Sequence, residues 1–409
     1  MVGDNKSLPT GWQWYKAGNV IDVRDGTHDS PKYQPTGIPL VTSKNLVNGA
    51  IDFSTCTFIS DEDHAAISKR SAVSNGDILY AMIGTIGNPV IVKKEFEFSI
   101  KNVALFKFGN DNVYNRYIYH YLKSNIVERQ FSKNARGGTQ KFVSLGNIRD
   151  LLIPLPPLEE QKRIATILDK ADTLRRKRQQ AIDLTEQLLR SVFLDMFGDL
   201  NDFPMVKIKE IAAKTKYSLS SGPFGSNLTS KHYEPDGVIV LRGTNVTSGW
   251  LNLDNVKYIS KDKAEELKRS KVCPDDIVIV AVGSSGHAFK IPKSLSFAVM
   301  SQNFNKVTPN KDKVTPIYLE YCFNSPLVQR QFKQNITDTV RTFLSLTKIK
   351  EVKIPLPPLE DQVHFENIVD QLHTHKTKLE NTLQEAEVLF SSLTQQAFRG
   401  ELTKQTEAA

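Results

Sequence analysis

The chain repeats itself, and this repeat limits its possible folds more than any other feature of the sequence. The run IPLPPLEEQ at 153–161 returns as IPLPPLEDQ at 354–362, which is 201 positions later. At the same spacing, Ser124, Gln130, Phe131, Phe142, Ser144, Leu145 and Ile148 match Ser325, Gln331, Phe332, Phe343, Ser345, Leu346 and Ile349. Nearer the start of each copy, Gly37, Asn45, Gly49, Asp77, Ile78, Gly84 and Gly87 match Gly237, Asn245, Gly249, Asp276, Ile277, Gly283 and Gly286. The sequence therefore predicts two tandem copies of one scaffold.

The segments between these shared positions differ. The first copy has DGTHDSPKY at 25–33, where the second has SLSSGPFGSN at 218–227. A purely structural duplication would drift everywhere, so this contrast favours two copies that bind two different ligands.

Each proline-rich run predicts the start of a long helix. Proline fits the first turn of a helix and not its interior, and acidic residues are favourable near the N-terminus. After Pro157, glycine and proline are absent as far as Phe197, and after Pro358 they are absent as far as Arg399.

The second of these helices has a heptad pattern, with nine of ten seam positions apolar. The ten positions are Phe365, Val369, Leu372, Lys376, Leu379, Leu383, Ala386, Phe390, Leu393 and Ala397. Their equivalents are Ile164, Leu168, Ala171, Arg175, Arg178, Ile182, Thr185, Leu189, Val192 and Met196. Seams of this kind require a helical partner, so we expect an antiparallel coiled coil. Helices of this length span roughly 60 Å at 1.5 Å per residue. This pairing would place the two copies at opposite ends, related by a pseudo-twofold axis.

The rest of each copy has short β-rich runs, at 37–42, 77–82, 89–92 and 103–108 in the first. A single helix is expected near Val113–Gln130, and another near Thr315–Gln331. The fold class is therefore α+β, with two mixed α/β domains and two long helices.

Composition adds limits of its own. The 409 residues suit two or three domains, and no stretch approaches the roughly 20 apolar residues that span a bilayer. The N-terminus lacks a signal-peptide pattern, and Cys56, Cys273 and Cys322 have no zinc or disulfide spacing. We expect a cytoplasmic protein without membrane contact. The net charge of +8 is compatible with nucleic acid but is weak support by itself.

Catalytic motifs are missing. The glycine pair in MIGTIG at 82–87 and the run NPV at 88–90 lack what an adenine methyltransferase needs to hold its cofactor and its flipped base. No GxxxxGK[ST] run is present to bind nucleotide phosphates. His373 and His375 lie on the second long helix without other clustered ligands, and a solvated helix face explains them better than a metal. We therefore expect no catalytic residue, no cofactor and no metal in this chain.

With these features together, the chain resembles the DNA specificity subunits of type I restriction–modification enzymes. The proline-rich junctions running into long helices carry the resemblance, as do GGTQKFVSL at 137–145 and DGTHDSPKY followed by GIPLVTSKN at 37–45. The resemblance covers essentially the whole chain. The second copy departs from it at DTVRTFLSL, 338–346, so its target should differ from that of the first.

The resemblance implies a mechanism. Each copy would be a target-recognition domain that reads one half of a bipartite, asymmetric site in double-stranded DNA, and the helices would set the gap between the halves. The chain would hold two adenine-N6 methyltransferase subunits, and in some systems two restriction (translocase–nuclease) subunits. S-adenosylmethionine, ATP and Mg²⁺ would be bound by these partners alone. The implied boundaries are 1–152 and 201–353 for the recognition domains, and 153–200 and 354–409 for the central and C-terminal spacer helices.

DNA-binding residues are expected on the loops of each copy, since Lys and Arg position phosphates while Asn, Gln, Ser and Thr read base edges. The candidates in the first copy are Thr27, His28, Lys32, Tyr33, Ser43, Lys44, Asn45, Lys101, Asn102, Arg136, Thr139, Gln140 and Lys141. Those in the second are Ser220, Ser221, Asn227, Lys231, Arg242, Asn245, Ser284, Ser285, Gln302, Asn303, Arg341 and Thr342.

Some features have two interpretations. The polar run Arg175–Arg178 either lines the DNA between the half-sites or forms a solvated face, and we favour the solvated face. Apolar residues outside the seam, such as Ile167 and Leu188, are candidates for contact with the methyltransferase subunits. Alternatives for the whole chain are a related system with a fused methyltransferase–nuclease partner, a self-sufficient methyltransferase or nuclease, and a coiled-coil scaffold that binds no DNA.

Overall fold

The computed structural model describes residues 8–109, 111–134, 142–198, 203–247, 250–282, 286–334 and 343–402. The chain divides into two compact units. Unit 1 comprises Met1–Gln179 and Glu380–Ala409, and unit 2 comprises Gln180–Leu379. Each unit thus takes about half of each long helix, and the boundary between the units falls inside both helices. The domain boundaries predicted from the sequence stay predictions.

The described part of unit 1 contains one copy of the scaffold. Its strands are β1 Gln13–Lys16, β2 Asp22–Asp25, β3 Ile38–Val41, β4 Leu46–Val47, β5 Ala50–Ile51, β6 Thr57–Ile59, β7 Ile78–Ala81, β8 Gly87–Ile91, β9 Ser99–Ile100, β10 Val103–Lys107 and β11 Leu152–Leu155. Its helices are α1 Ala17–Val20, α2 Asp61–Ser71, α3 Asn115–Leu122, α4 Asn125–Asn134 and α5 Leu145–Arg149, followed by α6 Leu158–Phe197, which continues into unit 2.

The described part of unit 2 contains the second copy. Its strands are β12 Met205–Lys207, β13 Leu219–Ser221, β14 Val238–Leu241, β15 Val246–Thr247, β16 Trp250–Leu251, β17 Lys257–Ile259, β18 Lys271–Val272, β19 Ile277–Val280, β20 Ala288–Lys290, β21 Ala298–Met300, β22 Phe304–Val307 and β23 Lys353–Pro355. Its helices are α7 Ile208–Ile211, α8 Lys261–Glu266, α9 Pro316–Asn324, α10 Pro326–Gln334 and α11 Leu346–Glu351, followed by α12 Leu359–Phe398, which returns to unit 1.

The two copies have the same central-sheet topology, which confirms the internal repeat. The central sheet has the order β2-β10-β7-β8 in unit 1 and β13-β22-β19-β20 in unit 2, with antiparallel neighbours throughout. A smaller sheet has β6-β3-β9 in unit 1 and β17-β14-β21-β18 in unit 2. In both, one pair is parallel: β3 with β9, and β14 with β21.

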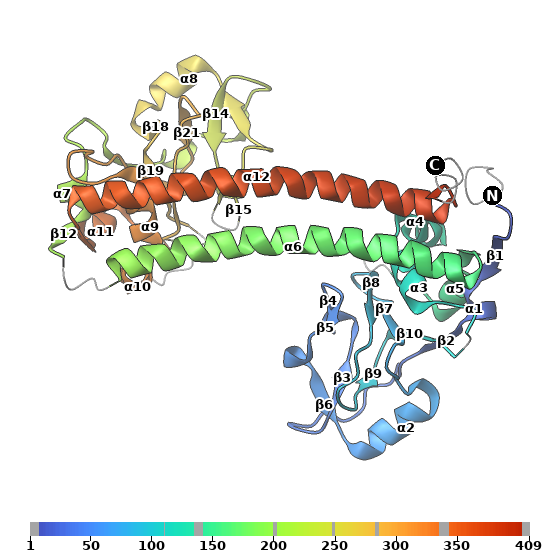
Figure 1. Cartoon of the computed structure of the whole chain (residues 1–409). Coiled ribbons are helices and arrows are strands. Elements are labelled where there is room, and N and C mark those ends of the chain that lie inside the picture. The colour runs from blue at the N-terminus through green and yellow to red at the C-terminus, as the bar shows by residue number, and fades with distance from the viewer. Residues whose placement is uncertain are drawn as a thin grey trace. The chain divides into compact units, whose positions relative to one another are not determined.

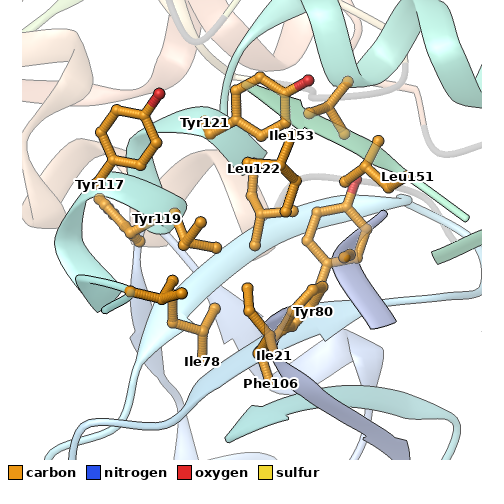
Figure 2. Close-up of a cluster of buried hydrophobic side chains, with 14 of the residues drawn as sticks. Ile21, Ile78, Tyr80, Phe106, Tyr117, Tyr119, Tyr121, Leu122, Leu151 and Ile153 are labelled. Carbon is orange, nitrogen blue, oxygen red and sulfur yellow. The ribbon is translucent and has the colours of Figure 1, made fainter. Parts of the chain in front are cut away.

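The core of unit 1 lies between one face of the central sheet and α3, as Figure 2 shows. Alternate residues of the strands face it, including Ile78, Tyr80 and Phe106, because successive side chains of a strand point to opposite faces. Tyr117 and Tyr121 enter this core from α3 and donate hydrogen bonds from their hydroxyls to the carbonyl oxygens of Pro154 and Leu152, each at 2.5 Å. These bonds attach the proline-rich junction to the domain.

The prediction of a single helix at 113–130 is wrong, because the structure has two helices there. α3 ends at Leu122 and α4 begins at Asn125, and the buried Ser124 between them donates from its hydroxyl to the carbonyl oxygen of Tyr121 at 2.6 Å. The second copy breaks at the same place, where Ser325 precedes Pro326 and a residue before proline is disfavoured in a helix.

The two long helices begin and end within one residue of the predicted bounds. They also pair as an antiparallel coiled coil (Figure 1). In unit 1, Arg175 and Arg178 contact Phe390 and Thr382, so the α12 numbers fall as the α6 numbers rise. In unit 2, Glu186 binds Lys376 at 2.6 Å, and Phe193 packs on Phe365 at 5.5 Å between ring centroids. All twenty predicted seam positions are buried or half-buried.

The polar middle of the α6 seam has a structural explanation that differs from both sequence interpretations. Arg175 lies over the Phe390 ring at 5.6 Å and binds Asp172 at 2.9 Å, while Arg178 donates to the carbonyl oxygen of Thr382. Arg176 binds Asp172 at 2.8 Å and donates to the Tyr119 hydroxyl at 3.0 Å. The preferred interpretation as a solvated face is therefore wrong for Arg175 and Arg178, which are half-buried in the seam, whereas Arg176 is exposed and still makes contacts within unit 1.

Candidate nucleic-acid interface

One edge of the central sheet in unit 1 gathers the loops on which DNA contacts were predicted. Asp25 at the end of β2 pairs with Ala104, and Ala81 at the end of β7 pairs with Val103 at the start of β10. Because the three strands are antiparallel, the segments after β2 and β7 and the segment before β10 must emerge at the same edge. These segments are 26–37, 82–86 and 101–102.

The smaller sheet brings a fourth segment to this edge. β3 runs parallel to β9, and the amide of Lys101 donates to the carbonyl oxygen of Val41 at 2.9 Å. Immediately after β3, the Ser43 hydroxyl donates to the carbonyl oxygen of Asn102 at 3.2 Å. Thr27 forms a parallel bridge with Lys101. Predicted residues from three separate stretches of the sequence are therefore neighbours in space.

His28 is fixed within this group. Its Nδ1 lies 2.8 Å from Oδ1 of Asn102, and its Nε2 lies 2.8 Å from Oδ2 of Asp25, which is 3% exposed. The hydrogen bonds to Asn102 and Asp25 raise the pKa of His28, and Arg70 forms an ion pair with the same aspartate. Since both ring nitrogens face protein oxygens, His28 has no free hydrogen-bonding nitrogen to offer a ligand.

The other candidates described in unit 1 are accessible, with one exception. Lys32, Tyr33 and Lys44 are exposed. Lys101 is half-buried, and its Nζ donates to the Ser30 hydroxyl at 2.6 Å and to the Tyr33 hydroxyl at 3.5 Å. The exception is Asn45.

Asn45 and its equivalent Asn245 have a structural role. They are 3% and 2% exposed. Oδ1 of Asn45 accepts from the amide of Thr42 at 2.8 Å, and its Nδ2 donates to the carbonyl oxygen of Asp52 at 3.1 Å. Asn245 makes the same pattern with Arg242 at 3.0 Å and Asn252 at 3.2 Å. With these bonds made, neither amide can reach a base, and the pair instead shapes the turn that presents its exposed neighbours.

Unit 2 builds the same edge with different side chains. The amide of Gly222, after β13, donates to the carbonyl oxygen of Phe304 at 2.9 Å, and the amide of Ser301 donates to that of Leu241 at 2.8 Å. Of the predicted residues, Asn227, Lys231 and Gln302 are exposed, and Arg242 and Asn303 are half-buried. Ser220 and Ser221 lie in β13 and are 0% and 8% exposed, so their side chains belong to the domain interior.

Eight predicted residues lie outside the described part of the chain and stay predictions: Arg136, Thr139, Gln140, Lys141, Ser284, Ser285, Arg341 and Thr342. Among the described residues that follow these segments, Phe142 bridges Ile83 and Phe343 bridges Val282.

Sequence reasoning missed two exposed residues at these edges. Thr85 is exposed at the tip of the β7–β8 hairpin, and the repeat itself would have found it, since Ser284 stands 199 positions later. Phe224 is 63% exposed in the loop after β13. No polarity signal marks Phe224, because the sequence alone does not separate an exposed phenylalanine from a core one.

Within the described ranges, no group of three or more His, Cys, Asp or Glu side chains is placed to hold a metal ion. Among the same residues, no helix is long and apolar enough to cross a membrane.

The duplicated frame, with divergent polar loops gathered at one sheet edge in each copy, defines a tandem-repeat protein with one candidate recognition edge in each copy. The family model described as "Type I restriction modification DNA specificity domain" matches residues 9–184 and 202–388. The chain belongs to this family, and the resemblance found in the sequence is confirmed. It is a specificity subunit of type I restriction–modification, not a catalytic one.

Individual relatives agree with this assignment. The type I restriction enzyme EcoBI specificity subunit of Escherichia coli is 25% identical, over 98% of this chain and 88% of its own length. The EcoKI specificity subunit of Escherichia coli strain K12 is 24% identical, over 98% and 91%. The crystal structure of a type I S subunit from M. genitalium covers 97% of this chain and 98% of its own, with a TM-score of 0.56 and 17% identity, which supports the fold.

Proposed function

We propose that the chain reads a bipartite, asymmetric DNA sequence, one half-site with each sheet edge. The observation that carries the proposal is that two frames with the same central-sheet order present different loops: His28, Lys101 and Asn102 in unit 1, against Asn227 and Gln302 in unit 2. Identical frames would approach equivalent segments of a duplex, and different side chains would select different bases. A DNA target is compatible with the cytoplasmic location that the sequence predicts, and that location is part of the proposal.

We further propose that the long helices position two adenine-N6 methyltransferase subunits, and restriction subunits where the system has them. Leu188 on α6 and Leu389 on α12 are equivalent in the repeat and are 48% and 52% exposed. A leucine left outside the seam at the same position of both copies supports two equivalent partner contacts. Ile167 instead packs against the core of unit 1, which makes Leu188 the better candidate. The cofactors S-adenosylmethionine, ATP and Mg²⁺ would then be bound by these partner subunits.

The helices also serve as a ruler in this proposal. Four residues inserted near Thr185, with four matched residues in α12, would lengthen the spacer by about 6 Å at 1.5 Å per residue. At about 3.4 Å per base pair, the gap in the target should grow by one or two base pairs. An unchanged gap in a folded, active variant would refute the ruler.

The decisive experiment is co-expression with the methyltransferase subunit encoded beside this chain, followed by mapping of modified adenines across the host genome. A bipartite asymmetric motif that requires both chains supports the proposal. Modification by this chain alone would overturn its non-catalytic role. A stable complex without modification would overturn sequence-directed methylation.

Phosphate contacts are tested separately through the predicted residues Arg136 and Arg341. Changing either to alanine should weaken binding to all sequences and flatten the salt dependence of the binding constant, because each phosphate contact releases a counterion. Unchanged salt slopes in both variants would remove these arginines from the interface.

A further inference from the structure

Phe224 is a large apolar side chain held away from every described hydrophobic cluster. It is 63% exposed, and it belongs to none of the described clusters or ring contacts. It sits in the loop after β13, at the edge assigned to DNA. The first copy has a polar ring at this place, because the segment after β2 is Gly26-Thr27-His28.

The backbone holds this loop firmly at both ends. A Cβ on Gly222 would collide with the carbonyl oxygen of Ser301, so only glycine allows the loop to leave the sheet along this path. Pro223 is buried, and Leu228 at the far end of the loop is 7% exposed. Between these anchors, 224–227 form one exposed turn. The ring is therefore presented on a short, supported protrusion.

Asn227 is exposed on the same turn, and its backbone amide donates to the carbonyl oxygen of Phe224 at 3.3 Å. The loop thus presents one apolar ring and one carboxamide three residues apart. In the major groove, a carboxamide pairs with N6 and N7 of adenine, and the one apolar group at a base edge is the thymine methyl. The minor groove displays no methyl group and shows the same acceptors for A·T and T·A.

We propose that Phe224 and Asn227 read A·T base pairs in the major groove of the second half-site, with Phe224 packing on a thymine 5-methyl group and Asn227 bonding to adenine. This rests on the proposed function, since it assumes that the edge of unit 2 contacts DNA. Phe224 is then a specificity-determining residue, and His28 gives the first half-site no equivalent preference.

The test uses the complex with the methyltransferase subunit and duplexes that carry its mapped motif, in which each thymine of either half-site is replaced in turn by deoxyuridine. For the unaltered chain, one replacement in one half-site should weaken binding about fivefold, as expected for the loss of one buried methyl group. Phe224→Ala should weaken binding to the normal duplex about tenfold or more. Its binding should not change further when that thymine is replaced by deoxyuridine. Phe224→Leu should keep part of the effect.

Phe96→Ala is the matched control, because Phe96 is 46% exposed in the connection between β8 and β9, at the opposite edge of the unit 1 sheet. It should bind both duplexes like the unaltered chain. The proposal is overturned if neither half-site contains A·T pairs or if Phe224→Ala binds normally. It is also overturned if deoxyuridine weakens DNA binding by Phe224→Ala by the same factor as it weakens binding by the unaltered chain. A Phe224→Ala variant that no longer binds the methyltransferase subunit but still binds DNA would overturn it too. Failure of the proposed function looks different, since the unaltered chain would then yield no motif.

Discussion

Replacing Gln161 by alanine should loosen the first recognition domain from its helix. Gln161 is the final residue of the repeated proline-rich run, and it is 0% exposed. Its Oε1 accepts from the amide of Tyr114, and its Nε2 donates to the carbonyl oxygens of Asn112 and Pro156, all at 2.9 Å. The side chain therefore connects the start of α3, the junction and the first turn of α6.

The size of the effect follows from the groups that lose their partner. Gln161→Ala removes the side chain that bonds to one amide and two carbonyl groups in a buried site, and the loss of such a partner costs about 1–3 kcal/mol for each group. Water can enter the space left by the side chain, so we take the low end for each. The expected loss is about 3 kcal/mol in the free energy of unfolding of unit 1. Gln362 makes the equivalent bonds with Thr315, Lys313 and Pro357, so Gln362→Ala should weaken unit 2 similarly.

Hydrogen exchange of individual amides, with mass spectrometry or NMR, is the suitable assay, because two units need not unfold in one step. The Tyr114 amide should exchange about a hundredfold faster in Gln161→Ala, whereas the Thr315 amide should be unaffected. Gln187→Ala is the control, since Gln187 is exposed on the same helix. Equal protection of Tyr114 in Gln161→Ala and Gln187→Ala would refute the reasoning.

Two further predictions concern pH. Burial alone would raise the pKa of Asp169, but hydrogen bonds from His120 and Arg116 outweigh it and lower the pKa to about 2. The stability from this group, about 2 kcal/mol, should be complete above its unfolded pKa near 4 and lost as the pH falls towards 2. Asp169→Asn should abolish this pH dependence of stability. Asp370→Asn, the change at the exposed equivalent position, should leave it intact. At His28, the raised pKa keeps the ring charged to higher pH, so DNA affinity should fall as the pH rises through that pKa. Binding titrations from pH 6 to 9 should show this fall, and a slope that persists in His28→Gln would assign it to another group.

Much of the architecture follows from local patterns in the sequence. The absence of Gly and Pro predicts α6 and α12 to within a residue, and their heptads predict which faces meet, because these signals act over a few turns of one helix. The break at Ser124 was missed because a single serine is a weak signal beside a strong apolar pattern. The break at Ser325 could have been predicted from Pro326, since the residue before a proline is disfavoured in a helix. The polar seam was misinterpreted because Arg175 and Arg178 find their partners on α12, about 200 positions away.

The candidate interface was harder to predict than the frame. Sequence reasoning chose polar loop residues, but it did not separate Asn45, whose side-chain amide is fully engaged, from its exposed neighbour Lys44. Polarity indicates that a side chain needs a hydrogen-bonding partner; it does not say whether the partner is protein or DNA. Only the three-dimensional contacts decide that.

Gly26 and Gly222 show why two frames can stay alike while their loops diverge. The repeat does not align them, since they stand 196 positions apart, yet both donate from the amide to the start of the neighbouring strand, β10 or β22. A Cβ on Gly26 would collide with the carbonyl oxygen of Ile100, as one on Gly222 would with that of Ser301. The exit from the sheet is therefore set by backbone contacts, and the residues beyond it are free to change with the target.

Gly26→Ala should displace Thr27 and His28 and weaken recognition of the first half-site alone. The expected result is binding that no longer distinguishes the correct first half-site from a scrambled one but still rejects a scrambled second half-site. Gly109→Ala is the control, because Gly109 is exposed with nothing within 4 Å of the added Cβ. If Gly26→Ala discriminated both half-sites normally, the loop after β2 would not contact DNA, and recognition by unit 1 would have to come from the β7–β8 hairpin and the segment after β3.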